Sequence, residues 1–313
     1  MTTRFTPRRE LGRTGFIATR IGIGDLADRS LPLEQCVETL RRALDFGLNL
    51  VDTAPSYEDG YSEQVVGRAL AGRRQGVFVI DKIDHFDRPV AAQAGESLAR
   101  LELNDVDAFV LHGVREPDQW DELARAGGRF EELERVKVAG KARFVGVSAH
   151  HPEVLRRAIS SGRCDIVLFP VGAFVDEDYV RDVLPLARAR GVGSVCFKTF
   201  GAGKLLGDTA GYGRPLEARP RGKWSSGGKA QEGDGSLPRL TVQDCVSYTL
   251  TCDPDVALLG MSFPNEQDAA LAATEAFQPL TEAELTAIRL RAADAIRHKG
   301  PCWWNAAPHA GTT

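Results

Sequence analysis

The chain has 313 residues, of which 43% are hydrophobic and 26% charged, a composition typical of globular proteins that excludes disorder of the whole chain. With 39 Lys and Arg against 43 Asp and Glu, its net charge is −4, so it lacks the basic surplus of nucleic-acid-binding proteins. No window approaches the ~18 apolar residues of a membrane span, and residues 1–9 do not have the pattern of a signal peptide. We therefore expect a cytoplasmic protein that binds a small molecule, with neither nucleic acid nor a membrane as partner.

Short apolar strands alternate with amphipathic helices along most of the chain. The first expected element is a hairpin around Gly12–Gly15. Apolar runs then predict eight strands, at 18–24, 48–51, 77–80, 107–111, 144–147, 166–169, 193–197 and 256–259. Amphipathic stretches predict helices between them, at 33–46, 62–70, 90–101, the residues before Gly140, 152–160, 178–190 and 242–250.

This alternation predicts a closed barrel. Eight strands, each followed by a helix, favour the (β/α)8 or TIM-barrel class of α/β folds, formed by residues 1–313 as a single domain. An open sheet that binds a dinucleotide usually carries G-x-G-x-x-G after its first strand. Here the first strand leads into Gly22-Ile23-Gly24-Asp25, and the third glycine is absent.

Two segments fall outside the repeating pattern. Residues 201–236 follow the seventh strand, are rich in Gly, Lys, Arg and Ser, and predict a long flexible loop over the active site. Residues 301–313 form a C-terminal extension that contains Trp303 and Trp304. These tryptophans fit either a contact with the core or a wall of a pocket.

Titratable side chains follow three of the predicted strands. Asp52 follows the second strand, with Tyr57 in the loop just beyond it. Lys82 follows the third strand and His112 the fourth. Each alone has a structural explanation, such as a helix cap or a solvated side chain. Because the active sites of barrels form where the strands end, the four together predict a catalytic site.

These residue types suit the reduction of a carbonyl group. A tyrosine hydroxyl titrates near ~10, and a neighbouring ammonium favours the phenolate, so we expect Lys82 to lower the pKa of Tyr57. A carboxylate at Asp52 would keep Lys82 charged, and His112 could hydrogen-bond a substrate oxygen. Tyr57 would give a proton to the carbonyl oxygen as hydride reaches the carbon. Since no side chain carries hydride, a nicotinamide cofactor is implied.

Several motifs in the same region resemble the aldo-keto reductase family. The stretch Val51-Asp52-Thr53-Ala54-Pro55-Ser56-Tyr57 is similar to the signature of that family's second strand. The residues Ser62-Glu63 and Val66-Gly67-Arg68-Ala69-Leu70 are similar to the helix that follows this strand in the family. Further matches are Leu111-His112 and Gly146-Val147-Ser148, and the likeness runs from about Arg9 to Glu275.

The resemblance implies an enzyme that reduces aldehydes or ketones to alcohols with a nicotinamide cofactor, or catalyses the reverse oxidation. It assigns Tyr57 as the general acid, Asp52 and Lys82 as residues that tune it, and His112 as the group that orients the substrate. It also implies a monomer or weak oligomer. The aromatic and basic residues of the loop and tail would suit a sugar-like substrate.

The resemblance also implies a set of cofactor-binding residues: Ser148, His150, Phe197, Lys198, Phe200, Gly201, Gly203, Ser262, Glu266 and Gln267. Most family members follow the strand-five serine with Asn, whereas this chain has Ala149 and then His150, which we expect to help hold the carboxamide. No Arg or Lys adjoins Ser262 to contact a 2′-phosphate, although Lys204 could substitute. NADPH (bound as NADP after turnover) is the expected cofactor, with NADH, the NAD form, as the alternative.

Two other functions stay open. A barrel metallohydrolase could draw ligands from His85, His112, His150 and His151. Against it, the first strand has no H-x-H pair and none of the six cysteines forms a C-x-x-C pair, so no metal is expected. A non-catalytic subunit that senses nicotinamide nucleotides fits the departures from the family pattern, but it would not need all four candidate catalytic residues.

Overall fold

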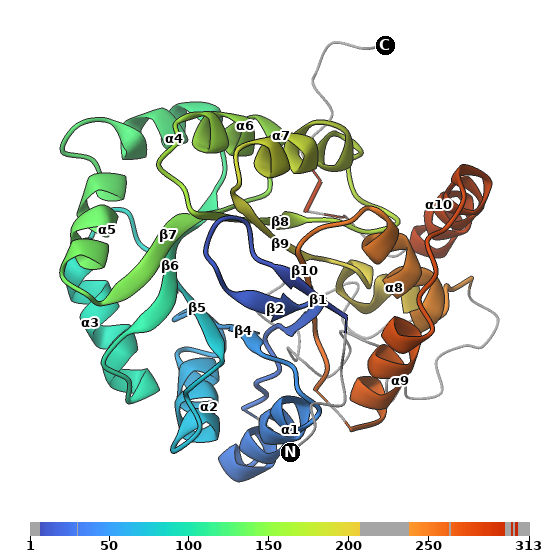
Figure 1. The fold of residues 1–313 in the computed structure, drawn as a ribbon, viewed down its shortest axis with the longest axis horizontal. Coiled ribbons are helices and arrows are strands. Elements are labelled where there is room, and N and C mark those ends of the chain that lie inside the picture. Colours follow the sequence, from blue (N-terminus) through green and yellow to red (C-terminus); the bar gives the residue numbers. More distant parts are fainter. Residues whose placement is uncertain are drawn as a thin grey trace.

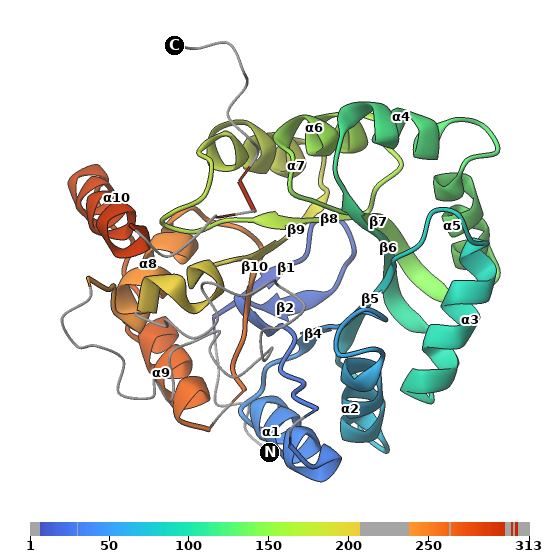
Figure 2. The same cartoon turned by 180° about the vertical axis from the view of Figure 1, so that it is seen from behind.

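The barrel expected from the sequence is present. The structure is a computed structural model, and it describes residues 7–29, 31–206, 238–262, 264–297, 302 and 304–305. Within these ranges eight parallel strands close into a barrel in the order β10-β3-β4-β5-β6-β7-β8-β9. Helices surround the barrel, as the views from its two ends show (Figures 1 and 2). The predicted (β/α)8 fold is therefore confirmed.

The elements have the following bounds. The strands are β1 (Arg8–Glu10), β2 (Ile17–Thr19), β3 (Ile21–Ile23), β4 (Leu50–Asp52), β5 (Phe78–Ile83), β6 (Val106–Val114), β7 (Ala142–Ala149), β8 (Ile166–Pro170), β9 (Gly193–Phe197) and β10 (Val256–Leu259). The helices are α1 (Leu33–Asp45), α2 (Tyr61–Leu70), α3 (Val90–Leu101), α4 (Pro117–Ala124), α5 (Arg129–Val138), α6 (Pro152–Ser160), η1 (Tyr179–Val183), α7 (Leu184–Ala189), η2 (Gly201–Leu206), α8 (Val242–Thr251), α9 (Pro264–Glu275) and α10 (Glu282–Ile296).

One predicted strand, 18–24, is wrong as a single element. It divides into β2, which pairs antiparallel with β1, and β3, which pairs in parallel with β4 and β10. The division falls at Arg20, where the backbone hydrogen bonds pass from the hairpin to the barrel. The amide of Thr19 donates to the side-chain oxygen Oδ1 of Asn49 at 2.8 Å, and Asn49 directly precedes β4. A run of apolar residues carries no signal for such a change of partner.

The helix predicted at 178–190 also differs from expectation. It starts as the π-helix η1 and becomes α-helical only in α7. Pro185 lies at the start of α7, and because proline has no N–H it cannot donate to the preceding turn.

The core has two layers, which follow from the alternation of side chains along each strand. The residues of one parity fill the barrel interior: Leu50, Phe78, Ile80, Ala108, Val110, Ile166, Leu168, Val195, Val256 and Leu258. The residues of the other parity pack outward against the helices, among them Val51, Val79, Phe109, Val147 and Val167. Consequently the parity of a polar residue on a strand indicates whether it faces the barrel interior or the helices.

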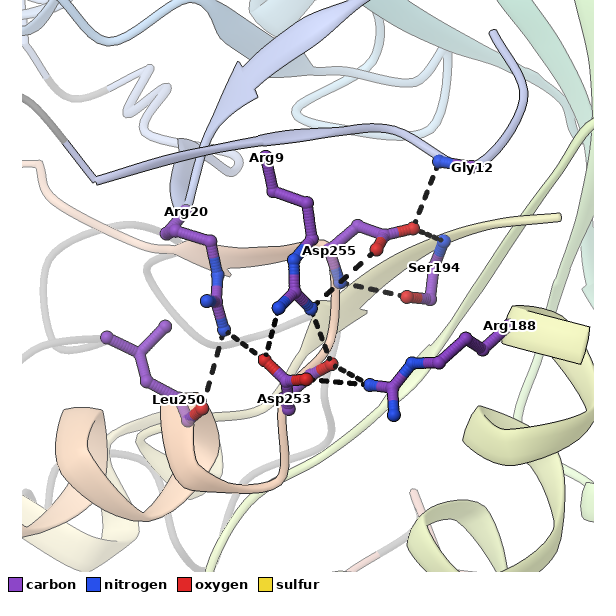
Figure 3. Close-up of polar contacts among 8 residues, drawn as sticks. All are labelled: Arg9, Gly12, Arg20, Arg188, Ser194, Leu250, Asp253 and Asp255. Carbon is purple, nitrogen blue, oxygen red and sulfur yellow. Dashed lines mark hydrogen bonds and ion pairs between the residues drawn. The ribbon is translucent and has the colours of Figure 1, made fainter. Parts of the chain in front are cut away.

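The hairpin β1–β2 closes the N-terminal end of the barrel. Leu11, at the end of β1, is fully buried and belongs to the interior layer. The close-up in Figure 3 shows how two aspartates before β10 hold the hairpin. Asp253 forms ion pairs with three arginines, Arg9, Arg20 and Arg188. Asp255 accepts hydrogen bonds from the backbone amides of Gly12 and Ser194 at 3.2 and 2.9 Å. Because the hairpin covers the N-terminal end, a functional site is expected at the opposite end of the barrel, where the strands end.

The two segments outside the repeating pattern are described only in part. The loop predicted at 201–236 begins with η2, and its residues 207–236 lie outside the described residues. Of the predicted tail, 301–313, the structure describes 302, 304 and 305. Trp304 is fully buried and its indole N–H donates to the carbonyl of Phe174 at 3.0 Å, which favours a core contact over a pocket wall. Among the described helices, none has the length and apolar character to cross a membrane.

Candidate active site

Strand parity brings the predicted polar residues to one place. Asp52 has the parity of Leu50 on β4, and Lys82 has that of Phe78 and Ile80 on β5, so both point into the barrel. His112 follows the same rule on β6. All three lie at the C-terminal ends of their strands, beyond the apolar interior layer. The site therefore sits at the end of the barrel opposite the hairpin.

Asp52 and Lys82 form a buried ion pair. The Lys82 Nζ lies 2.7 Å from Oδ1 of Asp52, and the two side chains are 2% and 5% exposed. The same ammonium donates to the carbonyl of Thr53 at 2.7 Å. Burial alone would lower the pKa of Lys82, but Asp52 and Tyr57 together raise it above its ordinary value. Lys82 is therefore a fixed positive charge, as the sequence predicted.

Tyr57 lies over this charge. The Lys82 Nζ is 4.4 Å from the centre of the Tyr57 ring, and the two groups share a side-chain hydrogen bond. Burial raises the pKa of Tyr57 to about 12, and the ammonium offsets only part of this effect. The expectation of a lowered pKa for Tyr57 is therefore wrong, because sequence cannot show how far a hydroxyl is removed from water. A raised pKa keeps the proton on the hydroxyl at neutral pH.

The turn after Tyr57 holds its ring at the site. Glu58 and Asp59 both have φ of 52°, in the left-handed region, and Gly60 follows with φ of 81°. Such a backbone is strained for residues other than glycine, and strain of this kind is concentrated at functional sites. The Tyr57 ring meets the imidazole of His112 edge to face, with ring centres 5.9 Å apart.

A fifth residue, Asp84, belongs to the site and was not predicted. Its Oδ1 forms a hydrogen bond with Nδ1 of His112, and its Oδ2 accepts the backbone N–H of Ser56 at 2.7 Å. Burial opposes its charge, but the hydrogen bonds from His112 and Ser56 hold the pKa of Asp84 at about 2. The signal was in the sequence: Asp84 lies two positions after Lys82, so it has the same parity one layer further along.

The residues expected to hold the nicotinamide lie at the ends of β7 and β9. Ser148, at the end of β7, is opposite His112 in register and is 1% exposed. The ring of His150 lies 5.1 Å from that of Phe197, at the end of β9. Burial lowers the pKa of His150 to about 3, with a smaller contribution from Lys198, so this imidazole is neutral. The structure thus places these predicted cofactor residues side by side.

The segment after β9 makes a tight turn with left-handed backbone conformations. Lys198 has φ of 74°, and Gly201 and Gly203 have φ of 55° and 85°. Phe200 is 3% exposed, so it packs below this turn rather than lining it. Lys204 is fully buried, with Nζ 5.5 Å from the centre of the Trp304 ring. Within this turn the amides of Gly201 and Gly203 donate to the carbonyls of Lys198 and Phe200 at 2.8 and 3.0 Å.

The residues after β10 have two different environments. The side chain of Gln267 is occupied: its amide donates to the carbonyls of Thr39 and Met261 at 2.8 and 3.3 Å, and its oxygen accepts from Arg42 at 2.9 Å. Glu266 is buried at 2% exposure. By contrast, Oγ of Ser262 is buried without a hydrogen-bond partner in the described ranges.

Thr199 repeats the situation of Ser262. Its Oγ1 is buried and also lacks a hydrogen-bond partner among the described residues. Buried hydroxyls without partners are uncommon in native proteins, and they are expected where a polar ligand completes the hydrogen bonding. Two such hydroxyls, in the turn after β9 and in the segment after β10, fit a polar ligand such as a nucleotide.

Asp81 lies outside the site although it adjoins Lys82 in sequence. Its parity turns it toward the helices, where it is fully buried near Glu63. Burial and the Glu63 carboxylate raise the pKa of Asp81 well above its ordinary value. Strand alternation explains this, because Asp81 precedes Lys82 on β5 and so faces away from the barrel interior.

The histidines proposed as metal ligands have other contacts. Nδ1 of His112 binds Asp84, and Nδ1 of His151 accepts the amide of Glu153 at 3.2 Å as the cap of α6. The amide and carbonyl of His85 both bond to the side chain of Gln93. In the part of the chain that the structure describes, no group of three or more His, Cys, Asp or Glu side chains is arranged to hold a metal ion.

Comparison with known proteins identifies the family. A family model described as the aldo/keto reductase family matches residues 20–289, which is most of the chain. The chain belongs to this family. The resemblance seen in the strand-end motifs is therefore confirmed across the whole barrel.

Several characterised aldo-keto reductases are similar in sequence. The aldo-keto reductase YhdN of Bacillus subtilis is 28% identical over 213 residues, which cover 62% of each chain. The L-galactose dehydrogenase of Arabidopsis thaliana is 28% identical over 214 residues, 63% of this chain and 66% of the relative. The NADH-specific methylglyoxal reductase of Escherichia coli is 25% identical over 243 residues, 68% and 73% of the two chains. The matches thus span about two thirds of these relatives' length.

Solved structures of aldo-keto reductases share the fold. The holo form of the aldo-keto reductase AKR11C1 from Bacillus halodurans has a TM-score of 0.68 and 25% identity, covering 91% of this chain and 95% of that one. An aldo-keto reductase from Klebsiella pneumoniae, solved in complex with NADPH, has a TM-score of 0.63 and 20% identity, covering 88% and 92%.

Proposed function

We propose that this chain catalyses the NAD(P)H-dependent reduction of an aldehyde or ketone to an alcohol, together with the reverse oxidation. The observation that carries the proposal is a protonated Tyr57 hydroxyl held against the Lys82 ammonium, whose charge is fixed by Asp52 at 2.7 Å. This combination gives a proton donor that is fully loaded at neutral pH and a cation beside it to stabilise the tyrosinate left after the transfer.

The reaction follows from these residues. A substrate carbonyl oxygen between Tyr57 and His112 would receive the Tyr57 proton while its carbon becomes saturated. As Tyr57 loses its proton, the adjacent Lys82 ammonium compensates the new negative charge, and Asp52 keeps that ammonium in place. In oxidation Tyr57 acts as tyrosinate and takes the proton of the alcohol. When bound, the nicotinamide supplies the hydride, which no side chain can provide.

The cofactor is proposed to lie across the ends of β7, β9 and β10. Ser148 and the neutral His150 would hold the carboxamide, and Phe197 would stack on the ring. The turn that contains Lys198, Gly201 and Gly203 would lie against the pyrophosphate, with Phe200 packed beneath it and the two glycine amides bonded within the turn. The segment that contains Ser262, Glu266 and Gln267 would bind the adenosine end. For Gln267 this role falls to the backbone, since its side chain is already bonded.

NADPH is the cofactor that we propose first. A lysine in the segment after β9, Lys198 or the buried Lys204, would compensate phosphate charge. An aldo-keto reductase solved with NADPH shares this fold, and a relative in sequence is named NADH-specific. NADH is therefore tested beside NADPH. The relatives that are named for a sugar or a small carbonyl make L-galactose and methylglyoxal the first substrates to test.

The proposal is tested by replacing the proton donor. Tyr57→Phe removes only the hydroxyl, so it should lower kcat for carbonyl reduction by more than ~100-fold and leave the affinity for NADPH, measured by tryptophan fluorescence, almost unchanged. Tyr61→Phe is the matched control, because the Tyr61 hydroxyl donates to the carbonyl of Leu31, away from Lys82.

Two outcomes would overturn the proposal. If neither NADPH nor NADH quenches the fluorescence, the chain is no nicotinamide enzyme. If Tyr57→Phe turns over at the wild-type rate, another group donates the proton. Binding of the nucleotide without turnover of any carbonyl by the wild-type protein would support the sensing subunit instead.

A further inference from the structure

The hydrogen bonds of Asp84 join the two groups that meet the substrate. One carboxylate oxygen bonds to Nδ1 of His112, and the other accepts the N–H of Ser56, next to Tyr57 in the chain. The Ser56 side chain contributes a further hydrogen bond to the same carboxylate. Asp84 therefore ties the loop that carries Tyr57 to the imidazole on β6.

The arrangement is rigid because Asp84 is almost fully enclosed. Its side chain is 8% exposed, whereas that of His112 is 21% exposed. Its position is set by the sheet: Ile83 pairs with Leu111 in register, so the residues that follow them, Asp84 and His112, face each other across β5 and β6. The edge-to-face contact between Tyr57 and His112 completes the group.

The bond to Asp84 decides where the imidazole carries its proton. An ionised carboxylate can only accept hydrogen bonds, so Nδ1 of His112 must be the donor. A neutral imidazole has a single N–H, so Nε2 would then be an acceptor. Only the imidazolium has N–H groups on both nitrogens, and only that form could donate from Nε2 to a carbonyl oxygen.

We propose that Asp84 is a positioning residue, which keeps a proton on Nδ1 of His112 and fixes the His112 ring relative to the Tyr57 loop. It leaves Nε2 as the ring nitrogen that meets the substrate. The assignment of substrate contact to His112 rests on the proposed function, whereas the protonation of Nδ1 does not. Asp84 touches neither substrate nor cofactor, and it acts through His112 and the backbone of Ser56.

The consequence for the reaction is a division of roles. Tyr57 is the sole proton donor to the carbonyl oxygen whenever His112 is neutral. Nε2 of the neutral ring can instead accept a hydrogen bond from a substrate hydroxyl, including that of the alcohol formed. As an ion pair with Asp84, His112 adds a second donor to the same oxygen, without transferring its Nδ1 proton.

The protonation is read directly by NMR. In protein labelled with ¹⁵N at histidine, a protonated and an unprotonated ring nitrogen have well separated shifts, and a His112→Gln sample assigns the signals of His112. We expect Nδ1 of His112 to be protonated at every pH at which the protein is folded. An unprotonated Nδ1 at any such pH overturns the proposal. Because this reading needs no turnover, it stands even if the wild-type protein reduces no carbonyl compound.

Substitution supplies the second test. Asp84→Asn keeps the size of the side chain but removes the charge, and its amide can donate to Nδ1, so the neutral ring should shift toward the form protonated at Nε2. With the ring and loop released, kcat for carbonyl reduction should fall about 10- to 100-fold, while the Kd for NADPH changes less than about twofold. Asp87→Asn, an exposed residue in the same segment, is the matched control.

The outcomes separate positioning from a merely structural role. Wild-type ¹⁵N shifts and kcat in Asp84→Asn would overturn the proposal. If Asp84→Asn fails to fold, Asp84→Glu keeps the charge but displaces it, and the same loss of kcat with a retained Nδ1 proton supports positioning. An Asp84→Glu variant with wild-type kcat would refute it, because the geometry would then be irrelevant.

Discussion

Removing the ammonium of Lys82 should destabilise the protein far more than the loss of one surface charge. Lys82→Met keeps a similar volume but leaves the Asp52 carboxylate, which is 5% exposed, without the cation now at 2.7 Å. It also removes the donor to the carbonyl of Thr53. Breaking a buried pair by deleting one partner costs about 3–5 kcal/mol, against about 0–1 kcal/mol for an exposed pair. We expect the free energy of unfolding to fall by about 3–5 kcal/mol at neutral pH.

The pH dependence of this loss follows from Asp52. Burial already raises the pKa of Asp52, and Lys82 is the largest influence that lowers it. Without Lys82 the pKa rises further, and a group whose folded pKa exceeds its unfolded value loses stability as pH rises through that range. The cost of Lys82→Met should therefore shrink as pH falls and Asp52 becomes protonated. Urea denaturation followed by tryptophan fluorescence, at neutral and acidic pH, measures both effects.

A double variant checks the physical cause. Asp52→Asn combined with Lys82→Met removes the uncompensated charge, so it should recover a large part of the lost stability while carbonyl reduction stays impaired. The reasoning is refuted if Lys82→Met costs less than about 1 kcal/mol, or if the double variant is no more stable than Lys82→Met.

Two further substitutions test the packing around the site. Because the pKa of Asp81 is raised in the folded protein, the free energy of unfolding falls as pH rises from the unfolded-state pKa to the folded-state pKa. Asp81→Asn should therefore flatten this pH dependence. The variant should be at least as stable as wild type at neutral pH. A steeper pH dependence would contradict this. Gly146→Ala would place a Cβ 1.9 Å from the carbonyl oxygen of Ile166, so it should cost at least ~2 kcal/mol in urea denaturation. Gly95→Ala, in open space on α3, is the control and should stabilise by about 0.5–1 kcal/mol.

The parts of the site that follow from strand order were predictable. The barrel was recognised because its strands are short and apolar and are followed by helices, and strands such as β9 and helices such as α3 have the predicted bounds. Once the fold is a barrel, residues at strand ends must gather at one rim. Asp52, Lys82 and His112 gather there for that reason, and the Asp52–Lys82 pair confirms the expected charge on Lys82.

What the sequence did not show depends on register and burial. Asp84 shares the parity of Lys82 but was missed, because its contact with His112 also requires the offset between β5 and β6, which no local pattern encodes. The direction of the Tyr57 pKa shift was wrong because desolvation outweighs the Lys82 charge, and a sequence gives charges but not water access. The cofactor-binding roles of residues such as Ser148 and Ser262 stay predictions.

The ion pairs of Asp253 also constrain the order in which this protein folds. Arg9 and Asp253 lie 244 residues apart in sequence, yet they meet at the N-terminal end of the barrel, its floor (Figure 3). The hairpin is synthesised before the aspartates that hold it, which lie shortly before β10, the strand that completes the ring. Contacts between residues so far apart in sequence form late. The entropy cost of closing the intervening loop must be met before the contacts stabilise the fold. We therefore expect the floor of the barrel to be among the last parts to close, with Leu11 buried only once β10 is in place.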